Sequence, residues 1–302
     1  MFKMILNSIL STIHFIIRYT GAAYLIRRFF ARKSITIIMY HNPEENVFRT
    51  HVEFLSKRYR FITLSDLIDF YYSPMKPGLP EYALLVTFDD GWKENCRLLD
   101  IIREYNIRPL IFLSSHLADT SRHFWFTACS DSETETLKNM PSDQRILWLK
   151  EIYGYYPEKE FPEKRQALNI DEINRVKEYV DFGSHTSFHT VLTKCDPEGK
   201  AAEIIGSVEK LEELLDREVS SFAYPNGDYD GESIELLKQC NIKIARTIDA
   251  GWNNRRTDPY RLKVTGASDD ATVTKLASEM TGISRYMQYF LKGSFNGLKP
   301  RI

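Results

Sequence analysis

The chain has 302 residues, of which 43% are hydrophobic and 27% are charged, and its formal net charge is −1. This length accommodates one large α/β domain or two small ones, and the composition is that of an ordinary globular protein. Because the net charge is close to zero, no overall attraction to nucleic acid is implied, and no nucleic-acid partner is expected. The four cysteines are scattered singly, which is typical of a reducing compartment rather than of a disulfide scaffold.

Residues 1–34 are expected to form a basic, amphipathic helical segment. Residues 1–43 contain no Asp or Glu but six Lys or Arg, and the apolar positions between residues 5 and 17 fall on one helical face. This stretch is too short and too interrupted to span a bilayer, and no clear signal-peptide cleavage site follows it. We therefore expect a cytoplasmic protein whose first helix lies on the inner face of the cytoplasmic membrane or caps the domain.

Short apolar runs alternate with helical patterns along the rest of the chain, which predicts parallel βα units. Strands are expected at residues 35–40, 61–63, 83–88, 110–113, 182–183, 221–223, 243–246 and 261–264. Helices are expected at residues 47–59, 95–105, 200–215, 232–239 and 271–280. About seven such units predict an α/β fold that closes into a barrel, with its chemistry at the carboxyl ends of the strands.

This domain is expected to cover residues 35–281 and to carry a long insertion at residues 115–170. The insertion is polar and aromatic and breaks the rhythm of strands and helices. Insertions of this length above a strand end often form the wall or lid of a binding site, although a purely structural elaboration is the alternative. Residues 282–302 are expected to form a basic tail, because no acidic residue follows Glu279.

Two adjacent carboxylates, Asp89 and Asp90, follow directly on an apolar run that reads as a buried strand. Such carboxylates repel each other and lose solvation, and a divalent cation is the usual compensation. About a hundred residues later, His185 and His189 follow a second apolar run. One carboxylate and two imidazoles make a good ligand set for zinc or a related metal, which would leave the other carboxylate free as a base.

These motifs resemble the polysaccharide deacetylase family with the NodB homology domain, carbohydrate esterase family 4. Residues 87–91 (TFDDG), 185–189 (HTSFH) and 222–227 (FAYPNG) are similar to its first three motifs, in the same order. Residues 37–41 (IIMYH) also resemble an opening strand found in many members. The resemblance runs from about residue 35 to residue 266 and implies a distorted, NodB-like (β/α) barrel.

The resemblance implies that Asp90, His185 and His189 bind one divalent metal, with zinc expected and cobalt or nickel as alternatives. It also implies that Asp89 is the general base that activates the attacking water. The third motif would then bind the substrate and its oxyanion. The residues expected to do so are Tyr224, Pro225, Asn226 and Gly227. Trp92, after the first motif, is expected to stack on the sugar.

The chain departs from the family pattern at two catalytic positions. Many members carry an arginine in the third motif that orients the base, whereas residues 221–224 contain none, and Arg261 is a candidate replacement. Members also supply a late histidine as the general acid, but no histidine follows His189. His41, at the end of the first strand, is a candidate for this acid, and His116 and His123 on the insertion are weaker ones.

The leading hypothesis is a metal-dependent hydrolase that removes N-acetyl groups from an N-acetylated sugar. The basic N-terminus favours a precursor or glycolipid of a bacterial surface polysaccharide, met at the membrane surface. One alternative is an amidohydrolase or deformylase of the same fold that acts on another amide. The other is a non-catalytic carbohydrate-binding member, which the two departures favour and the intact metal and base motifs disfavour.

Overall fold

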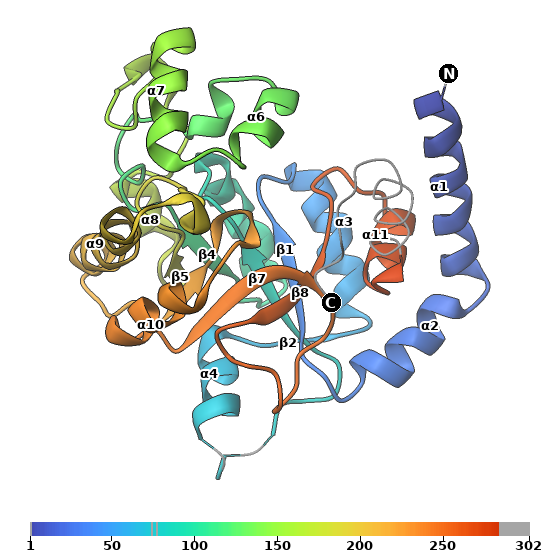
Figure 1. The fold of residues 1–302 in the computed structure, drawn as a ribbon. Coiled ribbons are helices and arrows are strands. Elements are labelled where there is room, and N and C mark those ends of the chain that lie inside the picture. Colours follow the sequence, from blue (N-terminus) through green and yellow to red (C-terminus); the bar gives the residue numbers. More distant parts are fainter. Residues whose placement is uncertain (1, 74, 77, 284–302) are drawn as a thin grey trace.

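The fold is built on eight parallel strands, seven of which close into a barrel (Figure 1). The computed structural model describes residues 2–73, 75–76 and 78–283. Neighbouring strands follow the order β1-β8-β7-β6-β5-β4-β3, and β1 also pairs with β3, which closes the ring. The strands are β1 (Thr36–Tyr40), β2 (Arg60–Phe61), β3 (Ala83–Phe88), β4 (Leu110–Leu113), β5 (Asp181–Ser184), β6 (Ser221–Ala223), β7 (Ile244–Ala250) and β8 (Leu262–Gly266).

The short strand β2 lies outside the ring. It pairs with the beginning of β3, at Ala83 and Leu84, whereas β4 pairs with the end of β3, at Thr87 and Phe88. Because β1 pairs along one edge of β3, β2 and β4 share the other edge of β3. The barrel is therefore distorted at this point, as the family resemblance implies. All eight strands expected from the sequence are present within a few residues of their expected bounds.

Alternation along the strands separates two hydrophobic cores. Ile37, Leu85 and Ile244 belong to the cluster inside the barrel, whereas Ile38 and Leu84 belong to the larger cluster between the barrel and its helices. Successive side chains of a strand point to opposite faces. Every second residue of each strand therefore points into the barrel. The same alternation directs the residue that follows β3, Asp89, toward the inside of the barrel.

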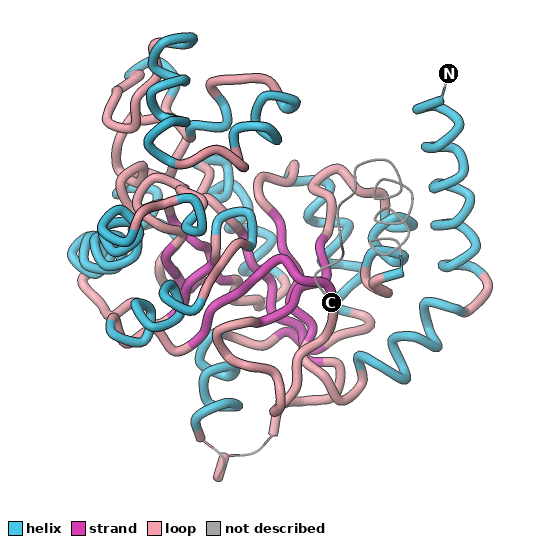
Figure 2. The backbone as a smooth tube through the Cα atoms, in the orientation of Figure 1, coloured by secondary structure: helices cyan, strands magenta, loops and turns pink. Residues whose placement is uncertain are grey.

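Helices surround the barrel, whose strands form the centre of the molecule (Figure 2). Those outside the insertion are α1 (Phe2–Tyr19), α2 (Ala22–Ile26), η1 (Arg27–Ala31), α3 (Glu45–Ser56), α4 (Leu64–Tyr72), η2 (Lys93–Leu98), α5 (Leu99–Glu104), α8 (Ile170–Val176), η5 (Leu192–Lys194), α9 (Pro197–Leu215), η6 (Pro225–Gly227), α10 (Gly231–Gln239) and α11 (Val273–Glu279). The helix expected at residues 95–105 forms as two consecutive pieces, η2 and α5. The helix at residues 64–72 was not expected, and a capping box of Thr63 and Asp66 starts it.

The insertion after β4 has a small hydrophobic core of its own. Its elements are η3 (Trp125–Thr127), α6 (Asp131–Leu137), α7 (Ser142–Tyr153) and η4 (Pro162–Lys164). Trp125, Leu137, Leu149 and Tyr155 form the buried centre of this part. It lies at the end of the barrel where the parallel strands finish (Figure 1).

The N-terminal segment forms three short helical pieces on the outside of the barrel. The helix α1 lies against α11, and Arg18 Nη1 donates to Thr274 Oγ1 at 2.6 Å. Within the described residues, no single helix is long and apolar enough to cross a membrane. Two bent pieces, Ile9–Tyr19 and Ala22–Ala31, pass that criterion only together, with a 64° bend between them. Most of the expected basic tail, residues 284–302, lies outside the described residues.

Candidate metal centre

Asp90 is fixed at the mouth of the barrel by the turn that ends β3. The turn needs left-handed backbone at two successive residues, with φ of 72° at Asp90 and 77° at Gly91. A Cβ on Gly91 would lie 2.3 Å from Leu113 Cδ2, so a side chain there has no room. Trp92 Nε1 donates to Asp90 Oδ2 at 2.9 Å. These contacts hold the carboxylate so that its second oxygen, Oδ1, is left for another partner.

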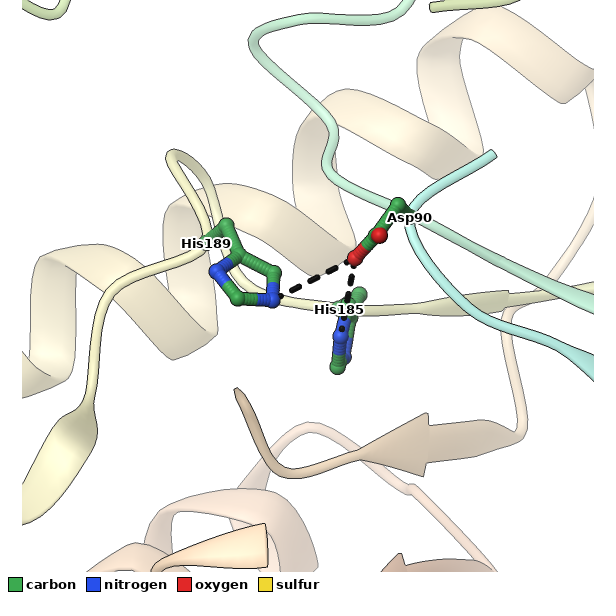
Figure 3. A group of neighbouring side chains, drawn as sticks. All are labelled: Asp90, His185 and His189. Carbon is green, nitrogen blue, oxygen red and sulfur yellow. Dashed lines mark ion pairs between the residues drawn. The ribbon is translucent and has the colours of Figure 1, made fainter. Parts of the chain in front are cut away.

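That oxygen faces two imidazoles (Figure 3). Asp90 Oδ1 lies 3.5 Å from His185 Nε2 and 3.3 Å from His189 Nε2. Asp90 and His185 are almost completely buried, and Asp90 Oδ1 has no hydrogen-bond partner among the described residues. A buried carboxylate oxygen without a partner is costly, so this arrangement indicates that a further group belongs between the three side chains.

The donor set and its spacing fit a divalent cation. Zinc and related ions take imidazole nitrogens and carboxylate oxygens at about 2.0–2.2 Å, which places tetrahedral ligand atoms roughly 3.4 Å apart. The three donor atoms all lie within 4.8 Å of one another. His185 Nδ1 is 2.7 Å from the carbonyl oxygen of Ala223 and donates to it, so Nε2 carries the free lone pair that a metal requires. The three residues can therefore hold one metal ion, as the sequence predicts.

The loop between the two histidines is strained and is held by the half-buried carboxylate of Glu203. Its φ angles are 66° at Thr186 and 57° at His189, which is a rare conformation for residues other than glycine. Glu203 of α9 accepts hydrogen bonds from the backbone N–H groups of Ser187, at 2.9 Å, and Phe188, at 3.0 Å. It also accepts one from Thr190 Oγ1 at 2.8 Å.

Asp89 has a different partner from its neighbour, although the two are adjacent in the chain. Both of its carboxylate oxygens accept hydrogen bonds from Nη2 of Arg246, on β7. Both residues are buried, and Arg246 also donates to the backbone oxygen of Thr247 at 3.1 Å. The site thus separates two carboxylates into one paired with a guanidinium and one facing imidazoles.

The pKa directions follow this division. Burial opposes ionisation of Asp89, but Arg246, with His185 and His41, outweighs it and holds the pKa of Asp89 below its ordinary value. Burial raises the pKa of Asp90, and the neighbouring Asp89 adds to that rise. Burial, followed by the charges of nearby cationic groups, lowers the pKa of His189 well below its ordinary value, so His189 is a neutral donor. A charged Asp89 and a neutral His189 are the states that a base and a metal ligand require.

The predicted contact between Arg261 and the base is wrong, because Arg246 makes that contact. Arg261 lies on the exposed surface, 3.5 Å from Asp258, and its guanidinium lies over the ring of Tyr229. Arg246 was missed because the pattern of residues 243–246 predicts a strand and says nothing about the partner of its arginine. A lone arginine in a buried strand requires a counter-charge, and that signal would have identified it.

The three histidines expected as candidates for the general acid have different surroundings. His41 follows β1 directly, its side chain is exposed, and its charge contributes to the lowered pKa of Asp89. His116 packs on Phe188 with the ring planes tilted by 40°, and its Nδ1 lies 3.0 Å from Ser115 Oγ. His123 Nε2 lies 2.7 Å from the carbonyl oxygen of Lys164.

The third motif begins within β6, the strand that supports His185. Tyr224 is buried, and its hydroxyl donates to the carbonyl oxygen of Tyr260 at 3.1 Å, so this side chain serves the core. Pro225 and Gly227 are buried as well, and Asn226 turns the chain with a φ of 57°. The motif includes Ala223, whose carbonyl oxygen accepts from His185, and this contact places the turn beside the candidate metal ligands.

Three tryptophan side chains, among them the expected stacking residue Trp92, have separate surroundings. Trp92 packs on Phe124 of the insertion, with ring centroids 4.7 Å apart. Trp125 is buried, and its Nε1 donates to the carbonyl oxygen of His189 at 3.0 Å, so the insertion supports a metal ligand directly. Trp252 stacks instead on Phe30 of the N-terminal segment, with ring centroids 5.7 Å apart.

Sequence comparison decides the family. Residues 76–245, more than half of the chain, match the family model described as Polysaccharide deacetylase. The chain belongs to the polysaccharide deacetylase family. Asp89, Asp90, His185 and His189 lie within the matched region. His41 and Arg246 lie outside it. No curated protein matches the chain.

Solved structures of deacetylases share the fold of this family member. The Streptococcus pyogenes deacetylase PplD, in complex with acetate, matches with a TM-score of 0.60 and 16% identity over 82% of this chain and 99% of that one. IcaB from Ammonifex degensii matches with a TM-score of 0.60 and 16% identity over 82% and 97%. A de-N-acetylase from Aggregatibacter actinomycetemcomitans gives a TM-score of 0.59 and 13% identity over 81% and 99%. At these identities the likeness concerns the fold alone.

Proposed function

We propose that this chain is a zinc-dependent hydrolase that removes the acetyl group from an N-acetylated sugar. Membership of the polysaccharide deacetylase family supports a carbohydrate N-deacetylase. The observation that carries the proposal is the division of labour between Asp89, paired with Arg246, and Asp90, turned toward His185 and His189. A carbohydrate-binding module has no need of a buried, ionised carboxylate beside a metal site.

In this proposal Asp89 is the general base. Arg246 keeps it ionised and fixes its carboxylate plane at the barrel mouth, so it can take a proton from the water that attacks the acetamide carbon. A base placed in this way typically contributes about 10²–10⁴-fold to the rate. Trp92 and the Ala223 carbonyl orient Asp90 and His185, so the ligand atoms are arranged before any ion binds.

A divalent cation held by Asp90, His185 and His189 would supply positive charge that polarises the amide carbonyl and makes water more acidic. Zinc is proposed because two imidazoles and one carboxylate suit it, and cobalt or nickel would fit the same donors. His41 is proposed as the group that protonates the leaving amine. Its exposed side chain at the end of β1 and its electrostatic coupling to both carboxylates support that role.

The proposed substrate is a precursor or glycolipid of a bacterial surface polysaccharide. The support is the acid-free, apolar N-terminal segment, which suits a protein whose substrate is held at a membrane. The cytoplasmic location expected from the sequence stays a prediction. Cell fractionation that found the protein outside the cytoplasmic membrane would contradict it.

Two measurements on one preparation test the proposal. We expect about one zinc per chain by elemental analysis of the purified protein, lost in His185→Ala and retained in Asp89→Asn. We expect acetate release from N-acetylhexosamine oligosaccharides and lipid-linked N-acetylhexosamine, reduced at least 100-fold in Asp89→Asn. Turnover by Asp89→Asn close to that of the unaltered protein would exclude Asp89 as the base. Full metal content without acetate release, but with hydrolysis of a formamide, would replace the deacetylase by a deformylase.

A further inference from the structure

The helix α1 carries an apolar arc that is wider than its neighbour covers. Residues Ile13, His14 and Ile17 turn inward, toward the side on which α1 lies against α11. Ile9 and Ile16 lie about 100° further round the helix and are about half exposed. A helix that is apolar on both its packed face and its free face requires a second apolar environment.

Large hydrophobic side chains are also exposed on α2 and η1. Leu25 is 50% exposed, Phe29 is 73% exposed and Phe30 is 58% exposed. More than half of the large hydrophobic side chains that are exposed among the described residues belong to these three helical pieces. We refer to the following residues as the N-terminal apolar surface: Ile9, Phe15, Ile16, Leu25, Phe29 and Phe30. A concentration of this kind marks an interaction surface rather than ordinary surface scatter.

The charges around this surface have one sign. Residues 1–43 contain no acidic residue; Arg18, Arg27 and Arg28 lie on the same helical pieces, and Arg32 and Lys33 directly follow η1. Among the described residues, only Arg32 of these five forms an ion pair, with Glu81 at 3.0 Å. Arg18 donates to Thr274 and Arg27 to the carbonyl oxygen of Arg58, so Arg28 and Lys33 are the exposed cations of this group. Exposed cations beside apolar side chains complement a surface that is apolar inside and anionic outside, which is the chemistry of an anionic lipid bilayer.

We propose that the N-terminal apolar surface is a monotopic membrane-binding surface for anionic phospholipids. Its helices lie in the interface with their free apolar side chains among the acyl chains and their cations at the headgroups. The 64° bend at Gly21 and the packing of α1 on α11 favour this arrangement over a span, because a spanning helix would be surrounded by lipid. The inference is independent of the proposed catalytic function.

This placement also orients the barrel relative to the bilayer. The start of α1 lies at the same end of the molecule as the insertion that follows β4, and α2 lies toward the opposite end (Figure 1). The insertion stands at the carboxyl ends of the strands, where the metal centre is. A membrane that contacts α1 along its length therefore lies beside the barrel wall. The start of α1 is then at the level of the candidate metal centre.

Binding to vesicles tests the proposal with the full-length protein and no turnover. The probe is sedimentation with vesicles of phosphatidylcholine containing 30% phosphatidylglycerol, compared with vesicles of phosphatidylcholine alone. We expect Ile16→Ser/Phe29→Ser to reduce the partition coefficient at least ten-fold. The matched control is Leu147→Ser/Ile152→Ser on α7, whose side chains are 58% and 57% exposed against 51% and 73% for the test pair.

A charge variant completes the test. Arg28→Gln/Lys33→Gln should weaken binding to the anionic vesicles, and added salt should weaken binding of the unaltered protein in the same way. Equal partitioning of the Ile16/Phe29 and Leu147/Ile152 variants would overturn the proposal. Failure to bind anionic vesicles, with Ile16→Ser/Phe29→Ser converting a dimer into a monomer, would show that a second copy covers the surface. Neither outcome depends on acetate release, so failure here leaves the catalytic proposal intact.

Discussion

At the residue scale, the candidate centre is decided by which partner each of two neighbouring carboxylates meets. Asp89 has the parity of the side chains that point into the barrel and meets Arg246 there. Asp90 belongs to the turn and is rotated away by its left-handed backbone. One residue along the chain therefore separates a proposed base from a proposed metal ligand.

The position of Arg246 makes a first residue-scale prediction. Arg246→Gln removes the cation that holds Asp89 ionised, so we expect turnover to fall at least ten-fold while one metal per chain remains. Removing one partner of a buried ion pair also destabilises a protein by about 3–5 kcal/mol, so Arg246→Lys is needed as a folded variant that keeps the charge. Steady-state kinetics and thermal unfolding on the same samples separate the two effects.

Arg261→Gln is the matched control, because Arg261 was the sequence-based candidate for the same task. It lies on the surface in a pair with Asp258, and such pairs contribute little. Its turnover should stay within two-fold of the unaltered protein. A loss as large as that of Arg246→Gln would mean that the observed pairing is not the functional one.

At the element scale, the site depends on how strand ends and their connecting loops are supported. His185, like Asp89, continues the inward parity of its strand, whose Gly183 lies inside the barrel: a Cβ there would meet Phe112 and Ser221. His189 lies beyond a strained loop and owes its position to other elements. Glu203 of α9 holds that loop, and Trp125 of the insertion holds the carbonyl of His189.

The support from α9 makes an element-scale prediction. Glu203→Ala leaves the N–H group of Phe188 and the hydroxyl of Thr190 without their carboxylate acceptor, at a cost of about 1–3 kcal/mol each, whereas the N–H group of Ser187 keeps the backbone oxygen of residue 203 at 3.2 Å. We expect the loop to relax and zinc affinity to fall about 10–100-fold, as for other residues that position metal ligands. Glu203→Gln keeps an acceptor oxygen and should restore most of the affinity.

Isothermal titration calorimetry with zinc measures this effect without turnover. Glu209→Gln, on the exposed part of the same helix, is the control and should bind zinc like the unaltered protein. Unchanged affinity in Glu203→Ala would show that the loop holds its shape without α9.

At the scale of the whole molecule, one buried histidine, His51, joins three parts of the chain and makes stability depend on pH. His51 of α3 is fully buried: its Nδ1 lies 3.1 Å from Tyr40 Oη of β1, and its Nε2 lies 2.6 Å from the carbonyl oxygen of Ala271, before α11. Burial lowers the pKa of His51, although the hydrogen bond to Ala271 and the charge of Asp269 oppose the change. The ring is therefore neutral in the folded protein, with Nε2 as the donor.

Because the folded pKa of His51 lies below the unfolded value, the unfolded chain binds a proton first as the pH falls. Stability should therefore be full above about pH 6.5 and should decrease below it by up to about 1.4 kcal/mol per pH unit for this group. Urea unfolding at pH 7.5 and 5.5 measures the change. His51→Gln, which can replace both hydrogen bonds, should reduce the loss.

The control for this prediction is His123→Gln. His123 Nε2 also bonds a backbone oxygen, that of Lys164, but on the insertion rather than at the centre of the molecule. This variant should retain the loss that His51 contributes. An equal loss in His51→Gln and in the unaltered protein would contradict a neutral buried His51.

By itself, the sequence determined the parallel strands, the barrel and a candidate metal site of one carboxylate and two histidines. Each of these rests on a local pattern: apolar runs bounded by turns, two carboxylates after one strand, and two histidines after another. Family resemblance then assigned Asp89 its expected role. The expected strand bounds agree with the structure to within a few residues, because periodicity in a short buried strand is a local property.

Only the tertiary structure decided which distant groups complete the site. The choice of Arg246 over Arg261 depends on the strand order, since β7 lies beside β6 and directs a side chain into the barrel, whereas Arg261 precedes β8 and remains outside. The roles of Glu203 and Trp125 depend on the docking of α9 and of the insertion. Such contacts join residues far apart in the chain, so no local pattern specifies them, and they emerge only when the barrel closes.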